Sequence, residues 1–165
     1  MTGGTQLAGQ INRNLARVCR EFVLGMGLGS CRPILSSDEH FPDFDMRETI
    51  GDDLPFYANL GIAQLEDMVL NDDISPVNGL IEKLRADGLI IHVNPLQEWL
   101  QPEGDLFSQP PIDTIRTYLE MTSYPVIVKE VGQGMGPESL RALLQLPLEA
   151  IETAAFGGTN FAKVE

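Results

Sequence analysis

Basic residues are scarce in this sequence. Its 165 residues contain 11 Lys and Arg against 24 Asp and Glu, which leaves a formal net charge of -13 at pH 7. A surface this acidic repels polyanions, so we expect no nucleic-acid partner. An anionic substrate would have to be bound by local donors or by a metal ion against this field. The few cations therefore become candidates for ligand binding, above all Arg32, Arg47 and Lys129.

Cysteines are equally rare, and long apolar runs are absent. Cys19 and Cys31 are the only cysteines, and their number and spacing fit neither a disulfide framework nor a zinc knuckle. We expect two reduced thiols at buried helix and loop positions. The sequence contains neither an apolar run of the length of a membrane span nor the basic start and apolar stretch of a signal peptide. We therefore expect a cytoplasmic protein that does not enter a membrane.

Several catalytic motifs are missing as well. The sequence contains no HExxH motif, no CxxC pair, no phosphate-binding P-loop and no nucleophile elbow around a serine. Zinc hydrolysis, phosphoryl transfer by a Walker motif and triad chemistry therefore have no support.

Hydrophobic periodicity predicts helices that alternate with strands. Helices are expected at 6–23, where Leu7, Ile11, Leu15, Val18 and Phe22 form one apolar stripe, and at 64–69, 77–84, 112–122 and 137–144. Strands are expected at 23–30, 55–61, from 89 onward, at 125–130 and at 150–154. The acidic stretch 36–53 shows no period, which predicts a loop or a short exposed turn.

Polar residues follow the predicted strands at or just beyond their carboxyl ends. The strands are apolar on both faces, which predicts a parallel α/β sheet covered by helices. We expect a (β/α)8 barrel of the TIM type in preference to a doubly wound sheet, because a polar residue follows every strand. Since such a barrel needs eight strands and about 250 residues, residues 1–165 would form a partial barrel domain of about five βα units. It would lack the first strand and the last strands.

The stretch from His92 to Glu98 has the most informative chemistry. Strand alternation places His92 and Asn94 on one face, pointing into the barrel mouth, while Gln97 and Glu98 follow in the next loop. Imidazole and amide donors suit phosphate oxygens, and a carboxylate suits a magnesium ion that bridges to a diphosphate. The alternative is a histidine and an asparagine hydrogen-bonded to loop backbone, with Glu98 in solvent.

Lys129 and three glycine turns are weaker candidates. Lys129 ends a predicted strand, where a cation can stabilise negative charge on a bound ring or phosphate. The alternative is an ion pair with Glu130 or Glu103. The turns at 2–4, 29–30 and 157–160 would allow close approach of backbone to a phosphate or flavin, but each is also typical of an ordinary turn.

Seven short motifs occur in the order, and at about the spacing, of the type II isopentenyl diphosphate isomerases, and the match runs nearly end to end. The motifs are Met-Thr-Gly-Gly at 1–4, Gly-Leu-Gly-Ser at 27–30, Ala-Asn-Leu-Gly at 58–61, His-Val-Asn-Pro-Leu-Gln-Glu at 92–98, Gln-Pro-Glu-Gly-Asp at 101–105, Val-Ile-Val-Lys-Glu-Val-Gly at 126–132 and Gly-Gly-Thr-Asn-Phe-Ala at 157–162. The chain resembles the central part of such an enzyme.

This resemblance implies a barrel that holds reduced FMN, with NADPH as the reductant. Mg²⁺ and isopentenyl or dimethylallyl diphosphate would bind above the flavin, and the full-length protein would be a homo-oligomer. The family's reaction is a 1,3-allylic proton shift in which the N5 region of the reduced flavin is the favoured acid and base. That fits a sequence in which no pair of side chains stands out as general acid and base.

Position by position, the resemblance also assigns roles to residues. Glu98 is implied as the magnesium ligand, and Gln97 as a substrate-pocket residue with a part in the proton chemistry. The implied flavin contacts are Thr2, Gly3, Ser30, Asn59, Lys129 and Thr159. The implied substrate contacts are Ser30, Arg32, His92, Asn94 and Gln97.

The chain departs from the family in four places. The N-terminal arm with basic substrate-binding residues and the last strands with the phosphate grip for FMN have no counterpart. Ala154 and Ala155 replace a typical Ser-Gly pair, and Cys31 replaces a polar residue. Two alternatives stay open: another FMN-dependent TIM-barrel oxidoreductase, such as an oxidase of 2-hydroxy acids, and a truncated, non-catalytic fragment or assembly module.

Overall fold

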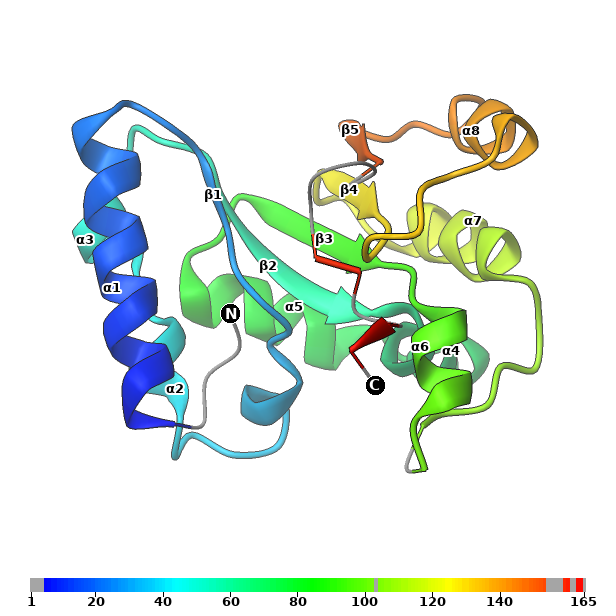
Figure 1. Cartoon of the computed structure of the whole chain (residues 1–165), viewed down its shortest axis with the longest axis horizontal. Coiled ribbons are helices and arrows are strands. Elements are labelled where there is room, and N and C mark those ends of the chain that lie inside the picture. Colours follow the sequence, from blue (N-terminus) through cyan, green and yellow to red (C-terminus); the bar gives the residue numbers. More distant parts are fainter. Residues whose placement is uncertain (1–4, 103, 154–158, 161–162, 165) are drawn as a thin grey trace. The chain divides into compact units, whose positions relative to one another are not determined.

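The computed structural model describes residues 5–102, 104–153, 159–160 and 163–164. Five strands form one sheet in the order β1-β2-β3-β4-β5 (Figure 1): β1 Met26–Gly27, β2 Phe56–Gly61, β3 Gly88–His92, β4 Val126–Lys129 and β5 Ala150–Glu152. β1 pairs with β2 in parallel, with Met26 opposite Phe56, and β4 pairs with β5 in parallel, with Val128 opposite Ile151. The chain divides into two compact units, Met1–Leu60 with Ser75–Ile90 and Gly61–Ile74 with Ile91–Glu165.

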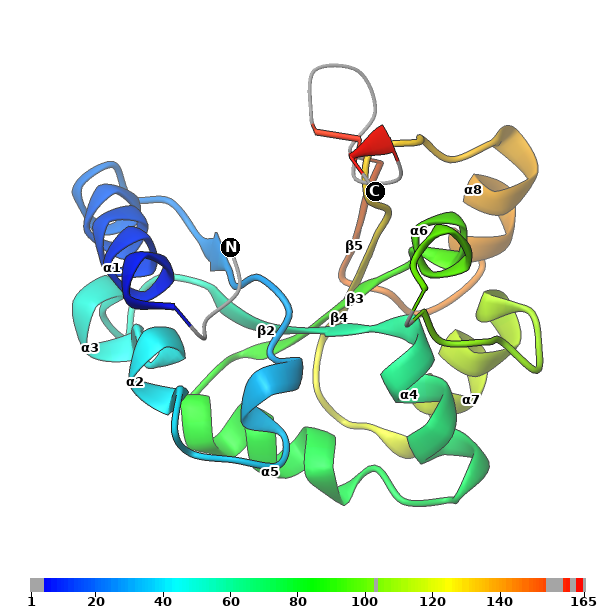
Figure 2. The same cartoon turned by 60° about the horizontal axis from the view of Figure 1, so that its bottom comes forward.

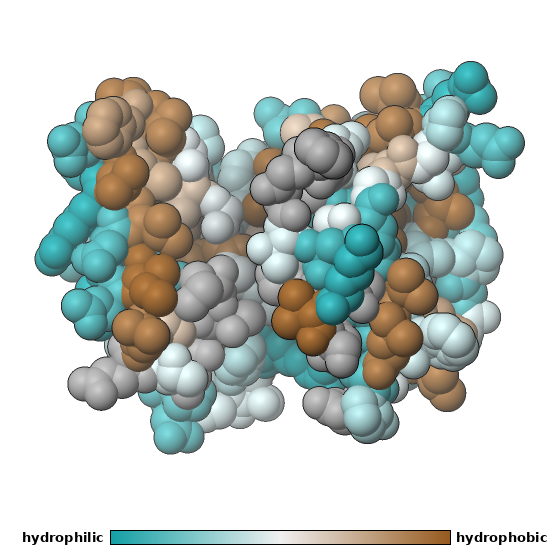
Figure 3. Space-filling view, viewed as in Figure 1, coloured by the Kyte–Doolittle hydropathy of each residue, from teal (hydrophilic) through white to brown (hydrophobic). Residues whose placement is uncertain are grey.

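In the first unit the long helix α1, Gln6–Glu21, packs on two short helices (Figure 1). The side chain of Thr5 caps its start, because Oγ1 accepts a hydrogen bond from the Ala8 amide at 3.1 Å. The buried face is made of small residues and of Asn12, whose Nδ2 donates to the Asp43 carbonyl at 2.9 Å. The predicted apolar stripe does not lie on this buried face. Four of its side chains are exposed, namely Leu7, Leu15, Val18 and Phe22. The stripe is visible in Figure 3.

The prediction of a loop at 36–53 is wrong. The segment contains helix α2, Phe41–Phe44, and helix α3, Arg47–Ile50. Phe44, Met46 and Ile50 from this segment are buried in the first unit. Each helix is a single turn, so the sequence has no room to show a helical period. The 3-10 turn η1, Arg32–Ile34, and helix α5, Ser75–Leu84, complete this unit.

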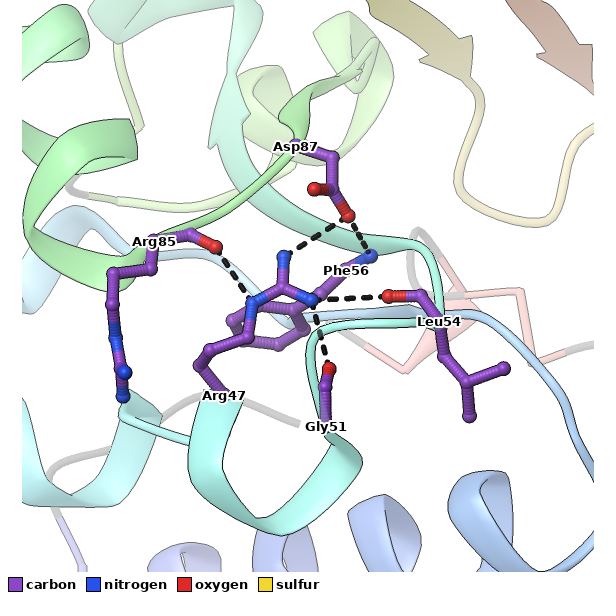
Figure 4. A network of polar contacts seen from close by, with 6 residues as sticks. All are labelled: Arg47, Gly51, Leu54, Phe56, Arg85 and Asp87. Atoms are coloured by element: carbon purple, nitrogen blue, oxygen red, sulfur yellow. Dashed lines mark hydrogen bonds and ion pairs between the residues drawn. The ribbon is translucent and has the colours of Figure 1, made fainter.

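Arg47 is a structural residue of the first unit and not a free cation (Figure 4). Its side chain is buried, and Nε donates to the Arg85 carbonyl at 2.7 Å. Nη1 donates to the carbonyls of Gly51 and Leu54, each at 3.0 Å, and Nη2 pairs with the Asp87 carboxylate at 3.0 Å. The guanidinium joins the loop before β2 to the loop before β3, and four of its five N–H donors are used in these contacts, which assigns it to the fold and not to a phosphate ligand.

The second unit contains β4, β5 and four helices among its described residues. Helix α4, Ile62–Leu70, packs against α7, Pro111–Met121 (Figure 2). Helix α8, Pro137–Leu143, precedes β5, as expected. A further helix, α6 at Pro95–Leu100, was not predicted. The proline at its first position has no amide hydrogen to contribute, which suits a helix start, but the turn is too short to show a period.

The predicted alternation of strands and helices is confirmed, and most predicted bounds lie within a few residues of the observed ones. The predicted (β/α)8 TIM barrel is corrected. Over the described residues the chain forms an α/β sheet whose outermost strands are β1 and β5, without closure into a barrel. Polar residues at the carboxyl ends of parallel strands occur in open sheets as well as in barrels, so that pattern could not distinguish the two. Over the same residues, the helices are all too short or too polar to cross a membrane.

Candidate functional site

The turn between β3 and α6, in the second unit, brings several polar side chains together. Asn94 precedes the first turn of α6, its side chain is buried, and its Nδ2 donates to Glu98 Oε1 at 2.7 Å. Gln97 Oε1 lies 3.5 Å from the same nitrogen. Asn94 and Glu98 are four residues apart, so one helical turn places them on the same face. Three of the four predicted residues of this stretch therefore lie together.

The amide oxygen of Asn94 is a buried acceptor that receives no hydrogen bond from the part of the chain that the structure describes. Buried polar atoms are satisfied in most folded proteins, by protein groups, water or a ligand. This oxygen lies on the same amide group as the nitrogen that donates to Glu98. One turn therefore holds both a carboxylate and a hard oxygen donor.

Glu98 is buried and not in solvent, which excludes the solvated alternative considered from the sequence. Its second carboxylate oxygen, Oε2, accepts the backbone amide of Asp105 at 3.0 Å. The loop that carries Asp105 approaches closely: a Cβ on Gly104 would lie 1.7 Å from the Glu98 carbonyl oxygen. Only glycine fits at that position without moving backbone.

His92, the last residue of β3, is half-buried in the second unit. Burial lowers its pKa to about 4, and the nearby Lys129 charge adds to the effect. The imidazole is therefore neutral at pH 7, so it offers one hydrogen-bond donor and one acceptor but no charge. A Cβ on Gly61 would lie 3.0 Å from Nε2, which leaves the ring little room on that side.

Lys129 supplies the positive charge near His92. The Val93 amide donates to the Lys129 carbonyl at 2.8 Å, which fixes the end of β4 beside the end of β3. Burial lowers the pKa of the Lys129 ammonium, while the carboxylates of Glu152 and Glu130 raise it. Nζ donates to the Glu130 backbone carbonyl at 2.7 Å. This contact is made to the backbone carbonyl and is not the ion pair with the Glu130 carboxylate that the sequence-based alternative named. Glu103 lies outside the described residues.

The Glu130 carboxylate organises the loop after β4. It accepts the amides of Gly132 and Gly134, each at 2.7 Å, and also that of Gln133. Gly132 has a φ of 112°, and a Cβ there would lie 2.2 Å from the carbonyl oxygen of Thr159. Thr159 is exposed. The structure thus brings one predicted flavin contact, Thr159, against the loop that follows another, Lys129.

Three predicted site residues belong to the first unit. Ser30 Oγ accepts the Arg32 amide at 3.4 Å, and the Arg32 side chain is exposed. Asn59 is buried, and its side-chain Nδ2 donates to the Leu28 carbonyl at 2.8 Å, while its backbone carbonyl accepts the Cys31 amide at 2.7 Å. The Asn59 side chain therefore joins the ends of β1 and β2. Thr2 and Gly3 lie outside the described residues.

The two thiols differ in their surroundings. Both are free, as predicted, and Cys31 is buried, but Cys19 is only half-buried. Burial raises the pKa of the Cys31 thiol to about 12, although a hydrogen bond with the Asn59 backbone opposes the shift. Cys31 is therefore an inert thiol at neutral pH.

Sequence reasoning missed two residues of α4 that support this region. Gln64 and Glu66 contact the loop that carries Asp105. Sequence spacing gave no sign of these contacts, because more than 40 residues separate the partners along the chain.

These residues include oxygen donors of the kind that a magnesium ion prefers. Within the described ranges there is no group of three or more His, Cys, Asp or Glu side chains arranged around a metal. Mg²⁺ does not need such a cage, because it commonly binds one or two carboxylates together with substrate phosphates and water. The Glu98 carboxylate and the Asn94 amide oxygen, which receives no hydrogen bond from any described residue, are hard donors of that kind.

Comparison with known proteins gives one consistent result. The chain is similar to isopentenyl-diphosphate delta-isomerases. It is 40% identical over 167 residues to the enzyme of that name from Synechococcus sp., and 40% identical over 165 residues to that from Deinococcus radiodurans. The one from Mycolicibacterium gilvum is 35% identical over 165 residues. These alignments cover 100% of this chain but 46%, 48% and 47% of the relatives, so the chain spans about half their length. No protein-family model matches the chain.

These similarities correct the more specific prediction made from the sequence. The alignments cover the whole of this chain but only about half of each relative. The relatives are named isopentenyl-diphosphate delta-isomerase, and that name specifies neither a type nor a flavin. The assignment to the central part of a type II, FMN-dependent enzyme therefore does not stand. What the similarity supports is the coarser name alone.

Proposed function

We propose that this protein acts in the isomerisation of isopentenyl diphosphate to dimethylallyl diphosphate. Two things support the proposal: the similarity to isopentenyl-diphosphate delta-isomerases along the entire chain, and the Asn94–Glu98 pair at the end of β3. The pair is the main structural support, because the buried Glu98 carboxylate lies beside the buried Asn94 amide, whose oxygen accepts no hydrogen bond within the described residues.

The diphosphate would bind at this turn. Glu98 and the Asn94 amide oxygen would hold Mg²⁺, which when bound offsets the negative charge of the diphosphate. Neutral His92 would donate one hydrogen bond to a phosphate oxygen, and Gln97 would donate another through its amide. Lys129 would add positive charge in a protein whose overall charge of -13 repels such a substrate.

The reaction moves one double bond and one proton position. A proton is added at the terminal carbon of isopentenyl diphosphate and another is lost from the carbon adjacent to the CH₂–O group, so the atom count is unchanged. Gln97 is an amide and cannot itself exchange these protons at neutral pH, so its proposed role is to orient the alkene and the group that does. Reduced FMN and NADPH stay predictions as cofactors, as does the homo-oligomer, and absorbance spectra of the purified protein would test the flavin.

The test compares the wild type with Glu98→Gln in an isomerase assay with isopentenyl diphosphate. We expect Glu98→Gln to lose at least 100-fold in kcat/KM at limiting Mg²⁺, because the substitution removes the charged metal ligand. Glu149→Gln is the matched control, since Glu149 is exposed. Equal Mg²⁺ dependence of the wild type and Glu98→Gln would rule out the metal role, and absence of conversion by the wild type would rule out the function.

A further inference from the structure

Two residues of α4, Gln64 and Glu66, contact the 104–109 segment that follows α6. Glu66 is buried, and one of its oxygens, Oε1, accepts the backbone amides of Ser108 at 2.7 Å and Gln109 at 3.1 Å. The hydroxyl of Ser108 donates to the same oxygen. A buried carboxylate that receives three donors from two consecutive residues fixes that part of the segment to the helix.

Gln64 holds the other end of the segment. Its Nε2 donates to Asp105 Oδ2 at 2.9 Å. Gln64 and Glu66 therefore attach the 104–109 segment to α4 at two points that lie three residues apart in the segment.

The same segment also contacts Glu98. The Asp105 amide donates to Glu98 Oε2, while Gly104 lies against the Glu98 backbone carbonyl. Asn94 holds the other oxygen, Oε1. The Glu98 carboxylate is thus oriented at Oε1 by the side-chain amide of Asn94 and at Oε2 by the backbone amide of Asp105. Asp105 belongs to the segment that is attached to α4.

We propose that Gln64 and Glu66 are positioning residues for Glu98. They fasten the 104–109 segment to α4, and the Asp105 amide on that segment holds the Glu98 carboxylate in the orientation in which it binds Mg²⁺. This inference rests on the proposed function for the metal, but the hydrogen-bond coupling it asserts is independent of any ligand. Partners that orient a metal ligand commonly change metal affinity by 10- to 100-fold when they are replaced.

The first experiment reads the coupling without a ligand. Amide hydrogen exchange, followed by NMR, compares the wild type with Glu66→Gln. We expect Ser108 and Gln109 to exchange at least 10-fold faster, and Asp105, which Glu66 does not touch, to exchange faster as well. Glu98→Gln should speed exchange at Asp105 but leave Ser108 and Gln109 unchanged. Unchanged exchange at Asp105 in folded Glu66→Gln would overturn the proposal.

Gln64→Met provides a second variant in case Glu66→Gln does not fold. It keeps most of the side-chain volume and removes the hydrogen bond to Asp105. We expect faster exchange at Asp105 with little change at Ser108. Gln145→Met, at an exposed position in the same unit, is the matched control and should leave all these rates unchanged.

The second experiment reads the metal. Mn²⁺ alone, a spin probe that accepts the same oxygen ligands as Mg²⁺, is titrated into each variant and followed by electron paramagnetic resonance. We expect about 10-fold weaker binding in Glu66→Gln and Gln64→Met, still weaker binding in Glu98→Gln, and no change in Glu149→Gln. Unchanged affinity in the two α4 variants would contradict the positioning role. If the wild type does not bind Mn²⁺, the proposed metal role of Glu98 fails, and the exchange experiment still decides the coupling.

In an active preparation, the two α4 variants should raise the Mg²⁺ concentration needed for half-maximal rate about 10-fold. Saturating Mg²⁺ should restore kcat to within about twofold, because the ligand itself is intact. A loss of kcat that excess Mg²⁺ does not restore would contradict a role in positioning the metal ligand.

Discussion

Replacing Arg47 with methionine should be among the most destabilising single changes in this protein. Methionine keeps the unbranched apolar stem, but it lacks the guanidinium, which lies 5.1 Å from the centre of the Phe56 ring, and it removes every donor. The carbonyls of Gly51, Leu54 and Arg85 then lose the donor that Arg47 supplies, and the Asp87 carboxylate loses its ion pair. Each buried acceptor left unsatisfied costs about 1–3 kcal/mol, and breaking a buried ion pair about 3–5 kcal/mol in all.

Because Asp87 is partly exposed and its carboxylate still accepts the Phe56 amide at 2.7 Å, we expect the lower end, about 3–4 kcal/mol. Urea unfolding followed by circular dichroism measures the change. Arg20→Met is the matched control: Arg20 is exposed, donates to the Ile50 carbonyl at 2.9 Å and lies 3.5 Å from Asp53, so about 1 kcal/mol or less is expected. Equal losses in the two variants would refute the structural role of Arg47.

Three further predictions concern acid stability, backbone strain and thiol reactivity. The pKa of His92 falls from 6.5 in the unfolded chain to about 4 in the fold. The stability that the neutral imidazole contributes is therefore fully present above pH 6.5, and the free energy of unfolding falls by up to about 3 kcal/mol as the pH is lowered to 4. His92→Gln should flatten the stability curve in that window, and an unchanged slope would contradict the shift. Gly132→Ala should cost about 2–3 kcal/mol because it combines a positive φ with a clash against Thr159. Gly134 has a φ of 85° and open space around it, so Gly134→Ala should lower the free energy of unfolding by only about 1 kcal/mol. Equal losses at the two positions would show that the clash with Thr159 does not contribute. Iodoacetamide at pH 8 should alkylate Cys19 in the folded protein and spare Cys31, because burial raises the pKa of the Cys31 thiol to about 12. Mass spectrometry counts the modified thiols, and two of them would contradict this prediction.

The elements that the sequence predicted share strong local signals. The strands β2 and β3 are mostly apolar, and α1, α5 and α7 each have a clear helical period. The missed helices α2, α3 and α6 have four to six residues, too few for a period to be seen. Which face of α1 is buried could not be predicted either, because small residues pack against α2 and α3 while large apolar ones stay exposed.

The site was predictable where its parts are close in sequence. Asn94 and Glu98 are one helical turn apart, so their contact follows from local structure once α6 is known. The contacts of Glu98 with Asp105, and of Gln64 and Glu66 with the 104–109 segment, depend on how distant parts of the chain pack. Arg47 shows the opposite case: scarcity of cations made it a candidate for ligand binding, and burial among three carbonyls assigns it to the fold.

Isomerase activity in the presence of Mg²⁺ is the most direct test of the proposed function. The purified protein is incubated in D₂O with isopentenyl diphosphate and Mg²⁺, with and without chemically reduced FMN, and followed by ¹H NMR. We predict formation of dimethylallyl diphosphate with deuterium in a methyl group, and loss of that signal in Glu98→Gln but not in Glu149→Gln. No conversion by the wild type under either condition, or full conversion by Glu98→Gln at limiting Mg²⁺, would contradict the proposal.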